Sequence, residues 1–243
     1  MEPLVEIKNL SIRFPEGNST FEAVKGISFS IGKGEIVGVV GESGSGKSMS
    51  ALALMGLLPK DAEIASGSLC FQGEDLVTMK PEKRRQLCGS KMAMVFQEPM
   101  TSLNPVLKIE RQVGESLRIH TKLGNAEIHE RVVQALSEVG LPDPEGLCGK
   151  YPHELSGGMR QRVMIAQAMI NSPSLLIADE PTTALDCVVQ AQILELLRNI
   201  HRTKGTSILF ISHDLNVVRA LCSRVIVVYK GEIVEEGQTE DVL

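Results

Sequence analysis

The sequence contains no tryptophan, and only 3% of its 243 residues are aromatic. Proteins that bind single-stranded nucleic acid by stacking bases need more aromatic side chains than this. A basic excess is also missing, since the formal net charge is −5 at pH 7, whereas nucleic-acid-binding domains are usually basic. Both deficits argue against a dedicated nucleic-acid binder, and no nucleic-acid partner is expected.

Long apolar runs are missing as well. The longest stretch without a charged residue spans residues 163–178 and is interrupted by Asn171-Ser172-Pro173, so it is too short and too broken to cross a bilayer. The N-terminal Met1-Glu2-Pro3 is not a basic segment followed by an apolar run, so we expect no secretory signal. These observations predict a soluble, cytoplasmic protein.

Cysteine is present but unpaired in the sequence pattern. No two of the five cysteines form a C-x-x-C pair, which favours buried free thiols in a reducing compartment over disulfides or a zinc site. The length and the 43% hydrophobic content fit one large domain or two tightly fused small ones.

Alternating patterns over residues 4–14 and 23–31 predict an antiparallel strand pair near the N-terminus. The continuous apolar run at 35–40 predicts a strand that is covered on both faces, followed by a helix over 48–58 that Pro59 ends. A charged section with helical spacing occupies residues 111–169, and residues 224–235 are typical of two short strands.

Three further apolar runs resemble the strand at 35–40, and each ends in polar residues. The runs cover residues 92–96, 175–178 and 208–211, and they are followed by Gln97, Asp179-Glu180 and His213. Strands that alternate with helices imply a parallel sheet with right-handed crossovers. Because such sheets bind ligands at the carboxyl ends of their strands, we expect these polar residues to gather at one edge.

The strongest motif is GESGSGKS at residues 41–48, which fits G-x-x-x-x-G-K-[ST] between a strand and a helix. Glycines at 41, 44 and 46 let the backbone N–H groups face phosphate oxygens. Lys47 would neutralise the β- and γ-phosphates, and Ser48 would offer a hydroxyl to Mg²⁺. The predicted ATP-binding residues of this loop are Gly41, Glu42, Ser43, Gly44, Ser45, Gly46, Lys47, Ser48 and Met49. The alternative is a Gly/Ser-rich loop without a ligand.

Two adjacent acids end the run LLIADEP at residues 175–181. Neighbouring residues on a strand point to opposite sides, so we assign Asp179 to Mg²⁺ and Glu180 to the attacking water, as in other phosphoryl-transfer sites. The alternative is a solvated pair of acids that opens a loop. Gln97 could ligate Mg²⁺ or water, and His213 could donate a hydrogen bond to the γ-phosphate, although single residues of either kind are more often structural.

The segment LSGGMRQR at residues 155–162 places Ser156 at a helix N-cap, followed by Gly157 and Gly158, with an amphipathic helix expected from Met159. Exposed backbone N–H groups at a helix N-terminus form an anion site. An ordinary cap would explain the serine but would leave the two glycines unused.

In this order, the motifs resemble those of the ATP-binding-cassette (ABC) ATPases over essentially the whole chain. The resemblance implies a P-loop NTPase with a RecA-like, mostly parallel α/β sheet core, an N-terminal antiparallel β-subdomain and a helical signature subdomain. The domain would span residues 4–243, with the helical subdomain inserted at about 98–168. It also implies that Ser156, Gly157, Gly158 and Asp186, in the turn Ala184-Leu185-Asp186, contact the ATP of a second subunit. Phe14, or less favourably Phe21, would stack on adenine.

The segments QEPMTSLNP (97–105), ADEPTTALD (178–186) and VQAQIL (189–194) are similar to those of the oligopeptide, dipeptide and nickel importer ATPases. That resemblance implies a non-identical sister ATPase, two membrane permeases and, indirectly, an extracytoplasmic solute-binding protein, at the cytoplasmic face of the membrane. Members usually continue past the last hairpin, and this chain stops at Leu243, which leaves open either the shorter nickel or metal-chelate type or a truncated chain.

Two other readings compete with the importer motor. A soluble ABC-type scaffold usually carries a long coiled-coil insertion, which this chain does not have, and a regulatory subunit without hydrolysis would not need Glu180 and His213. Within the importer reading, we expect a permease helix to dock beside residues 99–106, against Met100, Leu103 and Val106. The alternative is that these apolar side chains pack inside the helical section.

Overall fold

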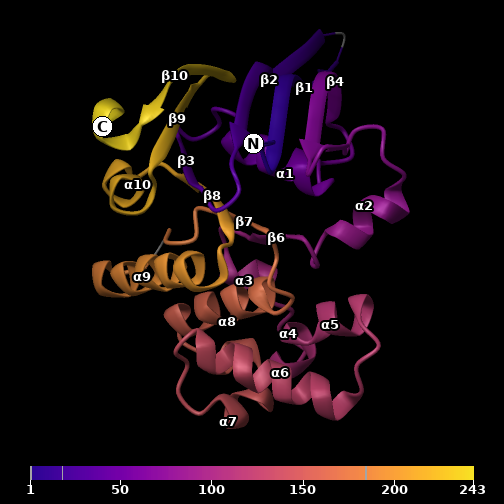
Figure 1. The fold of residues 1–243 in the computed structure, drawn as a ribbon, viewed down its shortest axis with the longest axis vertical. Coiled ribbons are helices and arrows are strands. Elements are labelled where there is room, and N and C mark those ends of the chain that lie inside the picture. The colour runs from indigo at the N-terminus through magenta and orange to yellow at the C-terminus, as the bar shows by residue number, and fades with distance from the viewer. Residues whose placement is uncertain (1, 18, 184) are drawn as a thin grey trace. The chain divides into compact units, whose positions relative to one another are not determined.

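The computed structural model describes residues 2–17, 19–183 and 185–243, apart from the side chains of Glu16, Pro99 and Met100. The chain divides into two compact units. The first combines residues 2–85 with Gly205–Leu243, and the second is Gln86–Lys204. In Figure 1 the first unit is indigo to magenta and yellow, and the second runs from magenta to orange.

An antiparallel sheet in the first unit has the strand order β2-β1-β4-β5. Its strands are β1 (Val5–Glu16), β2 (Ser19–Ile31), β4 (Glu63–Phe71) and β5 (Glu74–Asp75). The predicted N-terminal strand pair is therefore confirmed, with both strands longer than expected. The sequence pattern did not predict β4. In the sheet, β1 lies between β2 and β4, so that Val5 pairs with Ile31 of β2 on one side and with Phe71 of β4 on the other.

The P-loop strand of the first unit is β3 (Ile36–Val40), which pairs in parallel with β8 (Ser207–Ser212) and β9 (Arg224–Tyr229). A hairpin joins β9 to β10 (Glu232–Gln238), as predicted. Every residue of β3 and β8 is buried, which explains their continuous apolar runs. The helices of this part of the chain are α1 (Lys47–Met55), α2 (Pro81–Leu87), α10 (Leu215–Leu221) and α11 (Thr239–Val242).

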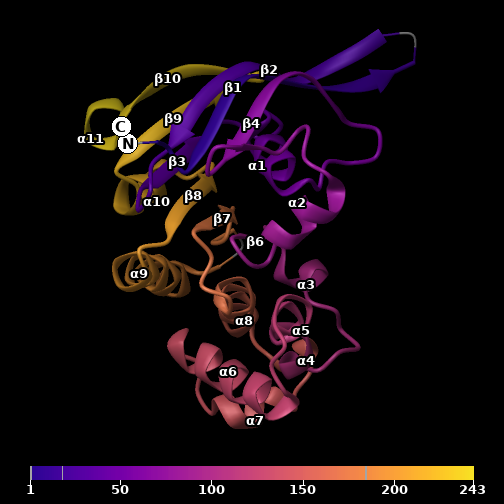
Figure 2. The ribbon, with the colours of Figure 1, turned by 45° about the vertical axis from the view of Figure 1, so that its right-hand side comes forward.

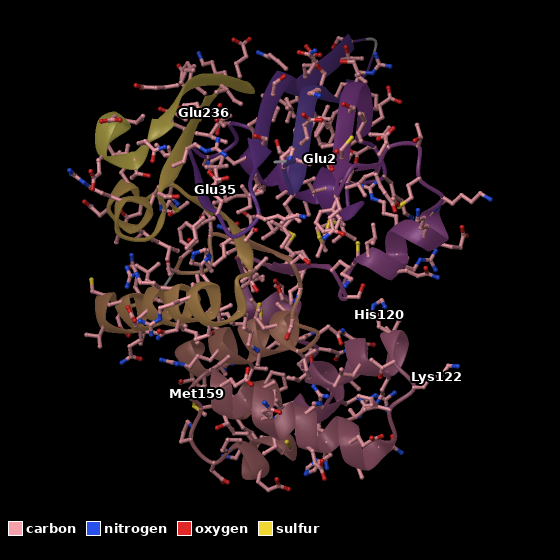
Figure 3. All side chains as sticks on the ribbon, viewed as in Figure 1. Glu2, Glu35, His120, Lys122, Met159 and Glu236 are labelled. Atoms are coloured by element: carbon pink, nitrogen blue, oxygen red, sulfur yellow. The ribbon has the colours of Figure 1, made fainter. Side chains whose placement is uncertain are left out.

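One charged network fixes β3 to the C-terminal hairpin. Arg224 donates from Nε to Oε1 of Glu35 at 2.8 Å and also bonds Glu236; both acids are labelled in Figure 3. Burial disfavours ionisation of Glu35, but the hydrogen bonds from Arg224 and the Gly32 N–H outweigh it, so the pKa of Glu35 is lowered. The network lies at the end of the β3–β9 pairing where Arg224 is opposite Val37.

The second unit pairs β6 (Met92–Val95) in parallel with β7 (Leu175–Asp179). Its helices are α3 (Pro99–Ser102), α4 (Ile109–Val113), α5 (Glu115–His120), α6 (Asn125–Glu138), α7 (Pro144–Cys148), α8 (Gly157–Met169) and α9 (Cys187–Lys204), with a 3-10 turn at Pro152–Glu154. Figure 2 shows α6 and α7 packed in layers below α8. Buried Val132 and Leu136 of α6 and Val163 and Ile165 of α8 belong to this core.

Three expectations about this fold were wrong. Helix α1 ends at Met55 and not at Leu58, because Gly56 takes a left-handed conformation (φ 70°) and its N–H caps the helix. Helix α8 begins at Gly157 and not at Met159. Leu103 was expected at a docking surface, but it is only 1% exposed; the side chain of Met100 lies outside the described residues.

All five cysteines are free, as expected, but only Cys148 and Cys222 are buried and Cys187 is exposed. Within the described residues, no helix is both long enough and apolar enough to span a bilayer. The domain bounds of 4–243, with a helical subdomain at about 98–168, stay a prediction.

Candidate active site

The loop after β3 turns directly into α1, and two of its glycines are required by close backbone approaches. A Cβ on Gly41 (φ +153°) would lie 2.0 Å from the carbonyl oxygen of Val228. A Cβ on Gly46 (φ +100°) would lie 2.4 Å from the carbonyl oxygen of Ala23. Gly44 (φ +78°) needs the left-handed conformation but faces open space. The loop is thus held against the surrounding backbone on one side and open on the other.

Lys47 is the first residue of α1, and its side chain reaches back to the start of this loop. Its side chain is 5% exposed, and Nζ donates to the carbonyl oxygens of Gly41 at 2.8 Å and Glu42 at 2.7 Å. The hydroxyl of Ser45 is buried and has no hydrogen-bond partner among the described residues. A buried cation beside an orphaned hydroxyl at a helix N-terminus is the donor set that phosphate oxygens satisfy.

The other residues of the first unit that were predicted to bind ATP or Mg²⁺ belong to the β1–β2 pair, to the end of β8 and to α1. Phe14 and Phe21 are direct cross-strand partners in the β1–β2 pair, so their side chains share one face of the sheet. Phe14 is half-buried, whereas Phe21 is 53% exposed. His213 is exposed and follows β8 directly. Ser48 and Met49 belong to the first turn of α1.

The second unit brings Gln97 and Glu180 together, as the strand-end argument predicted for this pair. Nε2 of Gln97 donates to Oε2 of Glu180 at 3.1 Å, and the hydroxyl of Thr183 donates to the same oxygen at 2.9 Å. Asp179 is 6% exposed at the end of β7. Glu180 has already left the strand, with φ at 47°, so its direction is set by this left-handed turn and not by strand alternation.

Thr183 is a residue that the sequence interpretation did not assign. Its backbone N–H donates to the carbonyl of Glu180 at 3.2 Å, which closes the turn that carries both side chains. The signal for it was present, because a threonine three residues after a strand-end acid is well placed to hydrogen-bond back to it.

Ser156 and Asp186 are both helix caps. The Ser156 hydroxyl accepts from the N–H of Met159 at 3.3 Å, which confirms the predicted N-cap of α8; Met159 is labelled in Figure 3. Oδ1 of Asp186 accepts from the N–H groups of Val188 and Val189 at 3.0 and 2.9 Å. Ser156, Gly157 and Asp186 are exposed. Ala184, the first residue of the predicted turn, lies outside the described residues.

The donor types fit Mg²⁺, because Mg²⁺ is usually bound through one or two carboxylates together with substrate phosphates and water. In the second unit, Asp179 has a buried carboxylate and Gln97 an amide oxygen, and in the first unit Ser48 has a hydroxyl. The described residues contain no group of three or more His, Cys, Asp or Glu that could hold a metal by themselves.

Comparison with known proteins gives one consistent result. Residues 24–183 match the ABC transporter family. The chain is 51% identical over 242 residues to the peptidoglycan transport ATP-binding protein YejF of Agrobacterium fabrum, covering 99% of this chain and 44% of that protein. It is 47% identical to the dipeptide transport ATP-binding protein DppD of Haemophilus influenzae, covering 98% of this chain and 72% of that protein. The chain therefore spans less than half of the first relative and about three quarters of the second.

Among solved structures, the dimeric ATP-binding cassette MJ0796, in a post-hydrolysis state bound to ADP and Pi, superposes with a TM-score of 0.87 at 28% identity. The match covers 97% of this chain and 98% of that one. The fold class predicted from the sequence motifs is thereby confirmed.

Proposed function

The chain belongs to the ABC transporter family, and we propose that it is the motor subunit of a peptide importer. As a family member it is an ATP-binding subunit and an ATP hydrolase that drives transport. The observation that carries the proposed site is the loop at 41–48, in which a buried lysine and an orphaned serine hydroxyl lie at the N-terminus of α1.

We assign phosphate binding to the loop residues 41–49. The backbone N–H groups would cradle the phosphates, and Lys47 would transfer its hydrogen bonds from the carbonyls of Gly41 and Glu42 to phosphate oxygens. Phe14 would stack on adenine, and the neighbouring Phe21 would extend the same apolar face. His213 would donate a hydrogen bond to the γ-phosphate.

We assign proton handling at the attacking water to Glu180. Gln97 and Thr183 both donate to its Oε2, and these two bonds would hold the carboxylate in the orientation in which it acts on a water. Mg²⁺, held by Asp179, Ser48 and Gln97, would supply charge neutralisation on the phosphate oxygens when it is bound.

The signature residues are proposed to complete the site of a second cassette. The resemblance assigns Ser156, Gly157, Gly158 and Asp186 to the nucleotide of a second subunit, and the similar cassette MJ0796 is described as dimeric. We infer a head-to-tail dimer with a sister ATPase, non-identical by the resemblance to peptide importers, bound to two permeases at the cytoplasmic face of the membrane, with an extracytoplasmic solute-binding protein acting indirectly.

Peptides are the proposed cargo class because DppD, described above, is named for dipeptide transport, whereas YejF is named for peptidoglycan transport. Further relatives at 44–45% identity are named for dipeptide or oligopeptide transport. The nickel or metal-chelate alternative is not favoured by these relatives, and neither is a soluble scaffold without a transport role.

We propose that the permease docks in a groove of the second unit beside α4 and α5. The groove has a volume of about 750 Å³ and is lined by apolar Val106, Leu107, Ile119 and Tyr151 and by charged Lys108, Glu110, Arg111, Glu115 and Arg118, among others. Val106 is 76% exposed and Ile119 is 69% exposed. Buried Gln112 accepts from the N–H of Asn104 and donates to the carbonyls of Asn104 and Leu107, so the loop at the rim is rigid. Exposed apolar residues that gather in one groove with a polar rim are typical of a protein-interaction site.

Protein concentration tests the composite-site proposal. Phosphate release by the purified chain should be low and should rise more than linearly with concentration, because each site needs Ser156 and Gly157 from a second cassette. Adding the sister ATPase at equal concentration should raise it further. A chain that remains monomeric with ATP and hydrolyses it in strict proportion to its concentration contradicts the proposal.

Transport tests the cargo. Proteoliposomes would carry the permeases encoded next to this chain, with the cognate binding protein outside and ATP inside. Labelled di- and oligopeptides should enter, and ⁶³Ni²⁺, alone or chelated, should not. Nickel uptake without peptide uptake overturns the cargo proposal but leaves the ATPase assignment intact.

A further inference from the structure

The two signature glycines are surrounded differently. A Cβ on Gly157 would meet no atom within 4 Å, whereas a Cβ on Gly158 would lie 2.8 Å from Cγ1 of Val189 and 3.6 Å from its Cγ2. Neither glycine has a positive φ, so backbone freedom is not what requires glycine at these positions. Gly158 is required, within its own chain, by the close approach of α8 to α9.

Val189 is poorly suited to moving away from an added methyl group. It lies in the first turn of α9, where its N–H donates to the Asp186 cap at 2.9 Å. A β-branched residue in a helix has one strongly preferred χ1 rotamer. Its γ-methyl groups are therefore fixed by the same turn that carries Asp186.

A second contact between the helices follows the first along both sequences. Nη2 of Arg162 donates to Oε1 of Gln192 at 3.0 Å. Arg162 is four residues after Gly158, and Gln192 is three residues after Val189, so each new partner lies on the same face of its helix one turn later. Arg162 also bonds the carbonyl of Val139 at the end of α6.

We propose that Val189 is a positioning residue that holds the signature segment, residues 156–158, and the Asp186 cap together as one surface for the second cassette. The proposal rests on the proposed function. Contact at Gly158 fixes how far the N-terminus of α8 can lie from the N-terminus of α9, and the Arg162–Gln192 bond fixes their rotation. Both elements would then meet the partner's nucleotide in one arrangement.

The test is a compensating pair of substitutions. Gly158→Ala should lower hydrolysis by the assembled dimer at least tenfold, because its Cβ pushes α8 away from Val189. Gly158→Ala combined with Val189→Ala should recover at least half of that loss on a logarithmic scale, since the γ-methyl groups that it meets are gone. Val189→Ala alone is the reference for the double variant.

Gly157→Ala, with and without Val189→Ala, is the matched control. Position 157 does not touch Val189, so the second substitution should not rescue it. If Gly158→Ala is as active as wild type, or if Val189→Ala rescues neither or both glycine variants, the proposal is overturned. Thermal unfolding of every variant shows that it is folded.

Two binding measurements separate this proposal from the proposed function. The Kd of the monomer for a fluorescent ATP analogue should be the same in all variants, and the protein concentration at half-maximal hydrolysis should rise in Gly158→Ala and return in the double variant. Loss of nucleotide binding by the wild-type chain would refute the proposed function itself. Intact binding without rescue would refute only the role of Val189.

Discussion

Gln97 and Glu180 are 83 residues apart in the sequence, and their side chains meet through a 3.1 Å hydrogen bond from Nε2 to Oε2. An ionised carboxylate accepts hydrogen bonds and donates none, so beside it the Gln97 amide turns its nitrogen toward Glu180 and its oxygen away. One glutamine can thus hold the proposed base and still present an oxygen to Mg²⁺. The pair links the carboxyl ends of β6 and β7 within the second unit.

Glu180→Gln should leave ATP binding intact and lower the hydrolysis rate about 10²–10⁴-fold, the range that a positioned general base supplies. The amide keeps the size of the side chain but cannot accept a proton from water. Phosphate release and the Kd of a labelled nucleotide should be measured together, with exposed Glu98→Gln as the control. A variant with more than half of the wild-type rate would rule out Glu180 as the base.

Thr183→Val tests whether the second hydrogen bond positions Glu180. Because the acceptor is the carboxylate of the proposed base, this hydrogen bond is to a charged group and contributes about 1.5–3 kcal/mol, so kcat should fall about 10- to 100-fold with little change in KM. Thr183→Ser keeps the hydroxyl and should retain most of the rate. Equal rates in the valine and serine variants would mean that the 2.9 Å bond to Oε2 does not serve catalysis.

Lys47→Ala should weaken ATP binding about 10- to 100-fold, since a hydrogen bond to a charged group contributes about 1.5–3 kcal/mol. The truncation also leaves the carbonyls of Gly41 and Glu42 without their present donor. Exposed Lys33→Ala is the control for the loss of one positive charge. An unchanged dissociation constant for ATP would place the nucleotide outside this loop.

The sequence predicted the phosphate loop well because its chemistry is local: strand, glycines, lysine and helix follow one another within fourteen positions from Ile36 to Met49. It also predicted that Gln97 and the strand-end acids would meet, since parallel strands end at one edge. It could not predict that Leu103 is buried while Val106 is exposed. That difference depends on Gln112, which fixes the loop between these two residues. Its Nε2 donates to the carbonyls of Asn104 and Leu107, which lie eight and five residues earlier in the sequence.

The Gly158–Val189 contact could not be predicted from the sequence either, for a related reason. The glycine pair was explained by its exposed N–H groups, and only the packing of α8 on α9 separates the roles of the two glycines. Likewise, Glu180 was expected to follow strand alternation, but β7 ends at Asp179 and a left-handed turn takes over.

The free energy of unfolding should depend on pH through His129, which contacts two carboxylates. Its Nδ1 lies 3.0 Å from Oε1 of Glu110 on α4, and its Nε2 lies 2.9 Å from Oε1 of Glu145 on α7. A neutral imidazole has one N–H and can donate to only one carboxylate. The hydrogen bonds with Glu110 and Glu145 therefore raise the pKa of His129. Burial raises the pKa of neighbouring Cys148 to about 11, so that thiol stays neutral near pH 7.

Because the folded-state pKa of His129 is raised, its stabilisation is fully present below the unfolded value of about 6.5. It is lost as the pH rises through the folded-state pKa. His129→Gln should therefore be less stable than wild type at acidic-to-neutral pH and should approach it in alkaline solution. Urea unfolding of both proteins from pH 6 to pH 9 measures the gap. A gap that is constant or grows with pH would contradict the two-carboxylate geometry.

Replacing Val106 and Ile119 together with Asp should uncouple transport from ATP hydrolysis. Both side chains are largely exposed in the groove beside α4 and α5, so the change should disturb the fold little and should leave the basal ATPase of the purified chain within about twofold, since surface substitutions usually change stability by less than about 0.5 kcal/mol. Two carboxylates would oppose any apolar helix that enters the groove, because burying an unpaired charge is costly.

Val234→Asp is the matched control, since Val234 is 59% exposed on β10 of the first unit and does not line the groove. Peptide uptake and pull-down of the permeases should both be lost in the double variant and retained in the control. Normal uptake by the double variant would show that the permease docks elsewhere. Lost uptake with retained pull-down would show that the groove couples ATP hydrolysis to transport but is not where the permease binds.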